Sequence, residues 1–305
     1  MEKLRLGLEW FLNPDHAPIL VAQAHGWLKD AGIELEVIEP EEHMDAIEAI
    51  EAGTMDFAIT EPLHLVEDRA EGEPVIGFAR FLHTNGGVMY LRDSGIARPR
   101  DMAGTRIQYP GAPGPGGPAI VRTMVEHDGG TAAEEDFTPV NNGFYHTDAL
   151  ADDLADVATL VFYNFEVVEA RHRGLDADFF ALKDWGIPDF CQLILVTTPT
   201  HLQARRDVFR RFIRVLRKGI DFLYQHPEES KAIYCEQAGV SPDDPLVSKT
   251  FAATLPCFTY DFSMTRAYYN ALESWLADTG LIKMRPGAKA YWTNGLSLPE
   301  IRVRV

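Results

Sequence analysis

The sequence predicts an α/β protein with two mainly parallel-sheet lobes, a ligand cleft between them and extra C-terminal helices. Three observations predict this fold class. Short alternating or β-branched apolar runs take turns with helical runs before Pro199, a turn signal at Ser94-Gly95 interrupts that rhythm, and long helical runs follow Pro199. Alternating strands and helices favour a parallel sheet with helices on both faces. A chain of 305 residues is long enough for two such units.

The first unit opens with a strand, a turn and a helix. Leu4, Leu6, Leu8 and Trp10 alternate as in a half-buried strand, and a turn at residues 13–15 precedes a helix from about residue 18 to 28. The same rhythm continues with expected strands at residues 33–37, 56–59, 75–81 and 88–91 and expected helices at 44–50 and 62–70. These segments are assigned to the first lobe.

A second α/β unit follows the turn at Ser94-Gly95. Its expected strands are residues 105–109 and 157–163, each leading into a helix, and residues 190–197 are again apolar and β-branched. The helical runs at 201–225, 230–238, 246–255 and 265–281 are expected to pack back onto the first lobe. Lobe 1 is therefore predicted to contain residues 1–93 and 195–305 and lobe 2 residues 94–194, with crossings near residues 92–95 and 194–198.

The charge balance argues against two classes of partner. The chain has 28 lysines and arginines against 46 aspartates and glutamates, a formal net charge of −18. Such a field repels nucleic-acid phosphates and anionic lipid surfaces, or simply keeps the protein in solution. The arginines between residues 205 and 217 alternate with apolar residues at helical spacing and are expected to form a solvated basic face.

The ends of the chain and the cysteines suggest a compartment. The sequence enters strand-like alternation directly, without the apolar core of a signal peptide, and no run approaches the roughly 18 apolar residues that span a bilayer. Cys191, Cys235 and Cys257 are odd in number and irregularly spaced, so neither disulfides nor a metal site is expected. The prediction is a cytoplasmic protein without membrane insertion, or an extracytoplasmic one if a leader was removed.

The end of the first strand carries a first group of candidate ligand-binding residues. Glu9 and Trp10 lie there, and Asn13 and His16 follow in the turn and at the helix start. Ligands of parallel sheets bind outside this edge. An indole offers a flat face to a heteroaromatic ring, and a carboxylate accepts a hydrogen bond from an amine. The alternative is a core tryptophan beside helix-capping residues.

A glycine- and proline-rich loop after the next lobe's first strand is a candidate anion site. The loop starts at Tyr109, itself a candidate ligand contact, and opens a helix near residue 118. Glycines let backbone N–H groups approach an anion at a helix N-terminus, which makes Gly111, Gly114, Gly116 and Gly117 candidates. The loop lacks a phosphate-binding fingerprint and its prolines lack N–H groups, so a plain interlobe loop is the alternative.

Two further groups follow strand ends. His64 is expected in the first turn of a helix, where the helix dipole disfavours an imidazolium and favours a neutral, hydrogen-bonding or reactive ring, or simply a structural histidine. Tyr163, Asn164 and Glu166 supply a ring, an amide and a carboxylate at the corresponding place in lobe 2. The recurrence predicts two walls that face one cleft.

Four segments carry a resemblance to a known family. They are residues 6–40 (LGLEWFLNPDHAPILVAQAHGWLKDAGIELEVIEP), 53–64 (GTMDFAITEPLH), 94–109 (SGIARPRDMAGTRIQY) and 291–299 (YWTNGLSLP). They resemble the thiamine-pyrimidine synthase and formylaminopyrimidine-binding family, whose fold is that of type II periplasmic binding proteins and ABC-transporter substrate-binding proteins. The resemblance covers nearly the whole chain and implies a small-molecule ligand.

The resemblance implies two alternative activities. In the synthases a lysine holds pyridoxal phosphate four residues before a histidine that donates ring atoms, in a single turnover; His64 stands at the histidine position, but Thr60 stands at the lysine position. The synthases also contain a Cys-Cys-Cys-Phe-Cys run, of which only Phe190 and Cys191 are present. As a synthase, the chain would use His64 and hold pyridoxal phosphate at the four loop glycines.

The binding proteins of the family imply a different function, and the absence of the synthase lysine and of most of its cysteine run favours that function. They resemble this chain at residues 163–166 and hold an aminopyrimidine between rings and carboxylates. The first hypothesis is therefore a non-catalytic binder of a thiamine-type aminopyrimidine, without a cofactor and with an ABC permease as partner. Trp10 and Tyr163 would stack on the ligand, and Glu9, Asn164 and Glu166 would hydrogen-bond it. A cytosolic sensor of another heteroaromatic metabolite is the third hypothesis.

Overall fold

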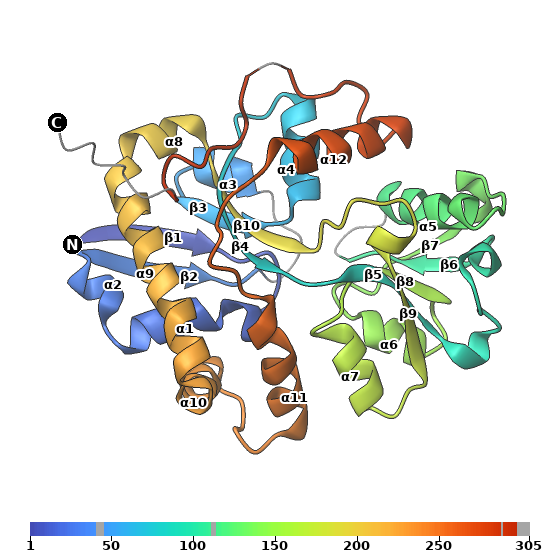
Figure 1. Cartoon of the computed structure of the whole chain (residues 1–305), viewed down its shortest axis with the longest axis horizontal. Helices are drawn as coiled ribbons and strands as arrows, with labels where there is room; N and C mark the ends of the chain where they lie inside the picture. Colours follow the sequence, from blue (N-terminus) through green and yellow to red (C-terminus); the bar gives the residue numbers. More distant parts are fainter. Residues whose placement is uncertain (41–45, 111–113, 288, 298–305) are drawn as a thin grey trace.

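The fold is built on two five-stranded sheets that stand side by side (Figure 1). The structure, a computed structural model, describes residues 1–40, 46–110, 114–287 and 289–297. The first sheet has the order β2 (Ile33–Ile38), β1 (Glu2–Gly7), β3 (Phe57–Thr60), β10 (Gln192–Thr197) and β4 (Ile76–His83). The second has the order β7 (Thr138–Val140), β6 (Arg106–Gln108), β8 (Val157–Phe162), β5 (Gly86–Leu91) and β9 (Ala177–Ala181).

The two sheets repeat one topology. In the first, β1 pairs in parallel with β2 and β3, and β10 runs antiparallel between β3 and β4. In the second, β6 pairs in parallel with β7 and β8, and β5 runs antiparallel between β8 and β9. Each lobe is thus a mainly parallel sheet with one antiparallel strand, and the predicted α/β class is confirmed. The ends of β1 and β3 in lobe 1 correspond to those of β6 and β8 in lobe 2.

Helices cover both sheets. Lobe 1 carries α1 (Ala17–Ala24), α2 (Trp27–Asp30), α3 (Ala46–Glu51), α4 (Pro62–Glu71), α8 (Pro199–Ala204), α9 (Arg206–Gln225), α10 (Pro227–Ala238), α11 (Pro245–Thr254) and α12 (Arg266–Asp278). Lobe 2 carries α5 (Gly116–His127), α6 (His146–Ala151) and α7 (Glu166–His172). Within the described ranges, no helix combines the length and apolar character needed to cross a bilayer.

The long helix α9 packs against α1 on one face of the first sheet (Figure 1). Its apolar side chains recur at helical spacing, and Phe209, Phe212 and Leu216 are fully buried. Gly219 lies where the two helices are closest, since a Cβ atom there would stand 2.3 Å from the carbonyl oxygen of Pro18. α10 also packs against α1 and α12 against α4, whereas α11 contacts both η1 (Pro14–His16) of lobe 1 and α7 of lobe 2.

The chain passes between the sheets earlier than predicted. β4 ends at His83 in the first sheet and β5 begins at Gly86 in the second, so the first crossing is at residues 84–85 and the predicted crossing near 92–95 is wrong. The return crossing lies between β9 and β10, not near 194–198. The reason is that residues 86–91, assigned to lobe 1, pair with β8 and β9. Composition does not reveal this, because an apolar strand fits either sheet.

The predicted solvated basic face of α9 is also wrong for several of its arginines. Arg205 donates to Asp56 and to the backbone carbonyl of Lys3, and Arg211 donates to Glu2 and to the carbonyl of Ala31. Arg206 and Arg217 donate to the carbonyls of Gly295 and Ser297. These guanidinium groups connect α9, and Arg205 directly before it, to β1, to the start of β3, to the end of α2 and to residues 295–297.

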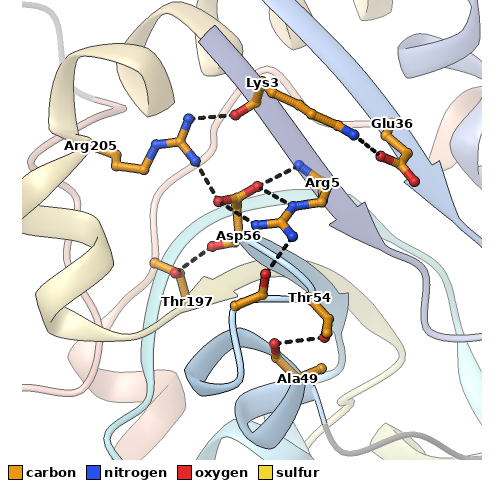
Figure 2. Close-up of polar contacts among 9 residues, drawn as sticks. Lys3, Arg5, Glu36, Ala49, Thr54, Asp56, Thr197 and Arg205 are labelled. Atoms are coloured by element: carbon orange, nitrogen blue, oxygen red, sulfur yellow. Dashed lines mark hydrogen bonds and ion pairs between the residues drawn. The ribbon is translucent and has the colours of Figure 1, made fainter.

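Asp56 is the centre of a buried ion-pair network at the start of β3 (Figure 2). Its carboxylate accepts hydrogen bonds from the backbone N–H of Arg5 (2.8 Å), from the Arg5 side chain (3.1 Å) and from Arg205 (2.5 Å). Its backbone carbonyl accepts a hydrogen bond from the Thr197 hydroxyl. Burial alone would raise the pKa of Asp56, but the hydrogen bonds from Arg5 and the charge of Arg205 lower it below its ordinary value.

Replacing Asp56 by alanine is expected to lower the free energy of unfolding by about 3–5 kcal/mol, because two partly buried guanidinium groups lose their counter-ion. Urea unfolding monitored by circular dichroism measures the change. Asp176→Ala, which removes a carboxylate that is 73% exposed, is the control and should change stability by at most about 0.5 kcal/mol. Because the pKa of Asp56 is lowered, the difference between wild type and D56A should shrink as the pH falls below the ordinary aspartate range. Equal losses in the two variants would contradict the assignment.

Candidate functional site

A cavity of about 640 Å³ lies between the two lobes. Its walls come from the carboxyl ends of β1, β3, β6 and β8, from α4, and from the segment at residues 281–284 that follows α12. Parallel strands place their carboxyl ends at one edge of a sheet, and ligands of such sheets bind there. The two corresponding edges therefore face one cavity, as the recurrence of polar groups in the sequence predicts.

The end of β1 contributes Glu9 and Trp10 to the cavity wall. His16 is fully buried behind Glu9, and its Nε2 lies 3.0 Å from Glu9 Oε1. The backbone N–H of Asn13 donates to His16 Nδ1 (3.2 Å), so Nε2 carries the hydrogen and donates to Glu9. Neither Asn13 nor His16 lines the cavity among the described residues, so the structure places them as supports that orient Glu9 and not as ligand contacts.

Trp10 belongs to an aromatic cluster that joins the lobes. Its ring stacks on Phe11 with centroids 4.7 Å apart and meets Phe165 edge-on at 5.2 Å. Phe162, at the end of β8, lies 6.2 Å from Trp10, and both side chains line the cavity. An aromatic ligand would therefore find one ring from each lobe.

His64 lines the cavity at the start of α4, with its Nδ1 3.0 Å from Glu61 Oε2 and 3.3 Å from the Thr60 hydroxyl. Burial would lower its pKa, but the hydrogen bond and charge of Glu61 outweigh that effect and raise the pKa to about 9. The expectation of a neutral ring is therefore wrong, because the carboxylates on α4 act more strongly on the ring than the helix dipole. His64 is positively charged at neutral pH.

The glycine-rich loop reaches the cavity only in part. Tyr109, Gly114 and Gly116 line it, and a Cβ atom on Gly116 would lie 3.0 Å from the Tyr109 ring. A Cβ atom on Gly117 would lie 2.9 Å from Ile107 Cγ2, so this glycine allows α5 to pack closely on the sheet. The remaining candidate, Gly111, lies outside the described residues.

The residues of the segment 163–166 lie in different places: at the cavity, at the protein surface and in the interior. Glu166 lines the cavity, whereas Tyr163 is 38% exposed, lies edge-on to Phe179 and accepts a hydrogen bond from Arg171. Among the described residues Phe162, the last residue of β8, lines the cavity, whereas Tyr163 in the following turn does not. The stacking of Tyr163 on a ligand stays a prediction, and this geometry gives Phe162 that place.

Asn164 makes contacts between lobes instead of lining the cavity. Its amide donates to Asp15 Oδ1 and to the Thr254 hydroxyl, both at 2.8 Å. Burial, strengthened by Glu9 and opposed by His16, raises the pKa of Asp15 to about 7. Instead of pointing to the cavity, Asn164 forms a buried link from the turn between β8 and α7 to η1 (Pro14–His16) and α11.

Sequence analysis missed one strong candidate, His146. It begins α6, is 2% exposed and lines the cavity. Burial lowers its pKa to about 4, so the ring is neutral, and its buried Nδ1 has no hydrogen-bond partner. Its Nε2 stands 4.0 Å from Glu166 Oε1. The only signal in the sequence is its place after the Asn-Asn-Gly turn at residues 141–143.

Glu166 is the second buried titratable group on this wall. Its Oε2 accepts a hydrogen bond from the Phe162 backbone N–H at 2.9 Å, and burial raises its pKa well above the ordinary value. Burial thus favours the uncharged form of this carboxyl, which beside the neutral imidazole of His146 offers hydrogen-bond donors and acceptors. No group of three or more potential metal ligands is assembled within the ranges that the structure describes.

Comparison with known proteins gives concordant matches. A family model described as NMT1/THI5 like matches residues 13–230. A Legionella pneumophila protein named 4-amino-5-hydroxymethyl-2-methylpyrimidine phosphate synthase is 31% identical over 84% of this chain and 80% of its own length. The formylaminopyrimidine-binding protein of Halalkalibacterium halodurans is 25% identical over 75% of this chain and 69% of its own.

A solved structure shows the same fold. The alkanesulfonate-binding protein SsuA from Xanthomonas axonopodis pv. citri superposes with a TM-score of 0.72 and 14% identity, over 95% of this chain and 98% of that one. At this identity the likeness concerns the fold alone.

The charge on His64 can be tested directly. Replacing Glu61 by glutamine should lower the pKa of His64 from about 9 toward the ordinary 6.5, since it removes the hydrogen-bonded counter-charge. NMR titration of the imidazole signals between pH 5 and 10 measures it. Glu36→Gln, which breaks a surface ion pair with Lys3, is the control and should leave the titration unchanged. A wild-type midpoint near 6.5 would contradict the assignment.

Proposed function

Because this chain belongs to the NMT1/THI5-like family, we propose that it is a non-catalytic protein that binds a thiamine-type aminopyrimidine in the interlobe cavity. The observation that carries the proposal is the wall formed by Glu166 and His146. The names of the relatives support a pyrimidine precursor as the ligand class. The binding-protein fold supports a small molecule held between two lobes.

The neutral carboxyl of Glu166 suits the edge of an aminopyrimidine. A protonated carboxyl presents one O–H donor beside one carbonyl acceptor. An aminopyrimidine presents a ring nitrogen that accepts beside an amino group that donates, so the two edges pair through two hydrogen bonds. Burial favours the protonated form of Glu166, and the Phe162 backbone N–H donates to Oε2 and holds it in place. His146 lies beside Glu166, and its buried Nδ1 has no hydrogen-bond partner.

The aromatic rings at the cavity suit the faces of the same ligand. Trp10 comes from the end of β1 and Phe162 from the end of β8, so ligand contact with both would link the lobes. Stacking and edge contacts of this kind contribute about 0.5–1.5 kcal/mol each beyond the area that they bury. Closure of the two lobes about the crossings at residues 84–85 and between β9 and β10 would accompany binding.

A second candidate function is synthesis of the thiamine pyrimidine with His64 as donor, which the position of His64 on the cavity wall and the name of the Legionella relative favour. Pyridoxal phosphate would supply an aldehyde and a carbon skeleton, but the residues present do not suit it. Thr60 cannot form a Schiff base, and the carboxylates on α4 repel a phosphate. Pro110 and Pro115 lack the N–H groups that cradle one.

The binding proposal predicts a contrast between two aromatic residues. Trp10→Ala should weaken binding of 4-amino-5-hydroxymethyl-2-methylpyrimidine about tenfold or more, because a ring that lines the cavity is lost. Tyr163→Ala should leave the affinity unchanged, because that ring lies on the outer face. Isothermal titration calorimetry measures both, with circular dichroism as the check on folding. Loss of affinity in Y163A alone would refute the arrangement.

The two candidate functions differ in the fate of His64. After incubation with pyridoxal phosphate and the aminopyrimidine, the peptide containing His64 should keep its full mass. Borohydride reduction should leave no pyridoxal phosphate attached to Lys283, the lysine that lines the cavity among the described residues. Peptide mapping by mass spectrometry reads both sites. Mass lost at His64 would establish the synthase instead.

A further inference from the structure

One wall of the cavity is strongly acidic. Four carboxylates of α4 and its N-cap residue line it, here called the α4 acidic wall: Glu61, Glu67, Asp68 and Glu71. We propose that this wall binds a positively charged amino group of the ligand, so that the ligand is an unphosphorylated heteroaromatic that carries an ammonium. This inference rests on the proposed function and specifies its ligand class.

Helix stability does not explain the wall. Glu61 lies at the N-cap, where a negative charge is favourable, and is paired with His64. Glu67 and Glu71 stand four residues apart in the second half of a ten-residue helix. Like charges at this spacing repel each other, and carboxylates near a helix C-terminus oppose the helix dipole. These side chains cost the helix stability, which a bound cation would restore.

Among the described residues, the cavity supplies little positive charge to Glu67 and Glu71 of this wall. Its cationic side chains are His64, which is engaged with Glu61, and Lys283, which is exposed. Within the ranges that the structure describes, no lysine or arginine forms an ion pair with Glu67 or Glu71. Burial and the neighbouring Glu71 raise the pKa of Glu67 and the charge of His64 lowers it, with a net rise, so His64 offsets the burial of this carboxylate only in part.

A second observation points independently to a ligand between the walls. On the opposite wall His146 is 2% exposed, and its buried Nδ1 has no hydrogen-bond partner. A buried polar atom without a partner is costly unless a bound molecule satisfies it. The neutral wall of His146 and Glu166 suits an uncharged heteroaromatic edge, and the acidic wall suits a cation. A ligand with both ends matches the two walls together.

The charge also selects between forms of one ligand. A phosphate ester would bring two negative charges toward Glu67, Asp68 and Glu71, whereas an aminomethyl group would bring one positive charge. An alcohol of the same size brings none. The three substituents on one aminopyrimidine ring should therefore bind in the order ammonium, alcohol, phosphate.

Calorimetry with three probes tests this order. They are 4-amino-5-aminomethyl-2-methylpyrimidine, its 5-hydroxymethyl analogue and the phosphate ester of that analogue. We expect the aminomethyl compound to bind about tenfold or more tightly than the alcohol, and the phosphate to bind more weakly than both. Raising the salt concentration from 50 to 500 mM should weaken binding of the aminomethyl compound and leave the alcohol unchanged.

A matched pair of variants assigns the effect to the wall. The double variant Glu67→Gln/Glu71→Gln should bring the aminomethyl compound and the alcohol to similar affinity. Glu134→Gln/Glu135→Gln changes the charge equally on an exposed turn away from the cavity and should preserve the difference. If E67Q/E71Q does not fold, the salt series on the wild type decides alone.

The outcomes separate this inference from the proposed function. Equal binding of the aminomethyl compound and the alcohol, or tighter binding of the phosphate, would overturn the ammonium assignment and leave the pyrimidine binder standing. A preference that persists in E67Q/E71Q would also overturn it. Failure of all three probes to bind would overturn the proposed function itself.

Discussion

An aspartate paired with an arginine of the neighbouring strand fixes the frame of each lobe, and it is buried in lobe 1 and half-buried in lobe 2. Asp56 precedes β3 and pairs with Arg5 of β1, and Asp156 precedes β8 and pairs with Arg106 of β6. The arginine backbone N–H donates to the aspartate in both lobes, at 2.8 Å and 2.7 Å. These pairs fix the start of the strands whose far ends line the cavity. The positions of Glu61 and Glu166 therefore depend on charges at the opposite edge of each sheet.

The contact between the lobes depends on a second buried polar group. Asn164 of lobe 2 donates to Asp15 of lobe 1, and Asp15 is adjacent to His16, which holds Glu9. The raised pKa of Asp15, about 7, places its titration near neutral pH. Cavity wall, lobe contact and the end of β1 thus form one connected set of groups, in which the charge of Glu9 also raises the pKa of Asp15.

The cavity joins two environments of opposite electrostatic character. In lobe 2, burial without counter-ions favours the uncharged forms of the Glu166 carboxyl and the His146 imidazole. Lobe 1 offers carboxylates on α4 and a charged His64. The Trp10 and Phe162 rings lie close to each other at the cavity. A molecule in this cavity therefore meets hydrogen-bonding groups on the lobe 2 side and charged groups on the lobe 1 side.

The sequence by itself determined the α/β class, the strand ends that carry the site and the family, because periodicity and turn residues act over short distances. Glu9, Trp10, Tyr109 and Glu166 were found in this way and do line the cavity. Only the tertiary structure decided that β5 joins the second sheet and that the arginines of α9 bind carboxylates and carbonyls instead of water. Both outcomes depend on partners distant in sequence.

The choice between Phe162 and Tyr163 was also decided by the tertiary structure. β8 contains a bulge, and Leu160 there has a φ of +60°. Because of the extra residue, Ala158 and Val161 lie on one face of the strand, and Leu160 and Phe162 line the cavity. Simple alternation in the sequence does not reveal a bulge, because the extra residue is defined by pairing with β5. The sequence does not indicate a role for His146 either, because the properties of a histidine depend on the groups that surround it in the folded protein.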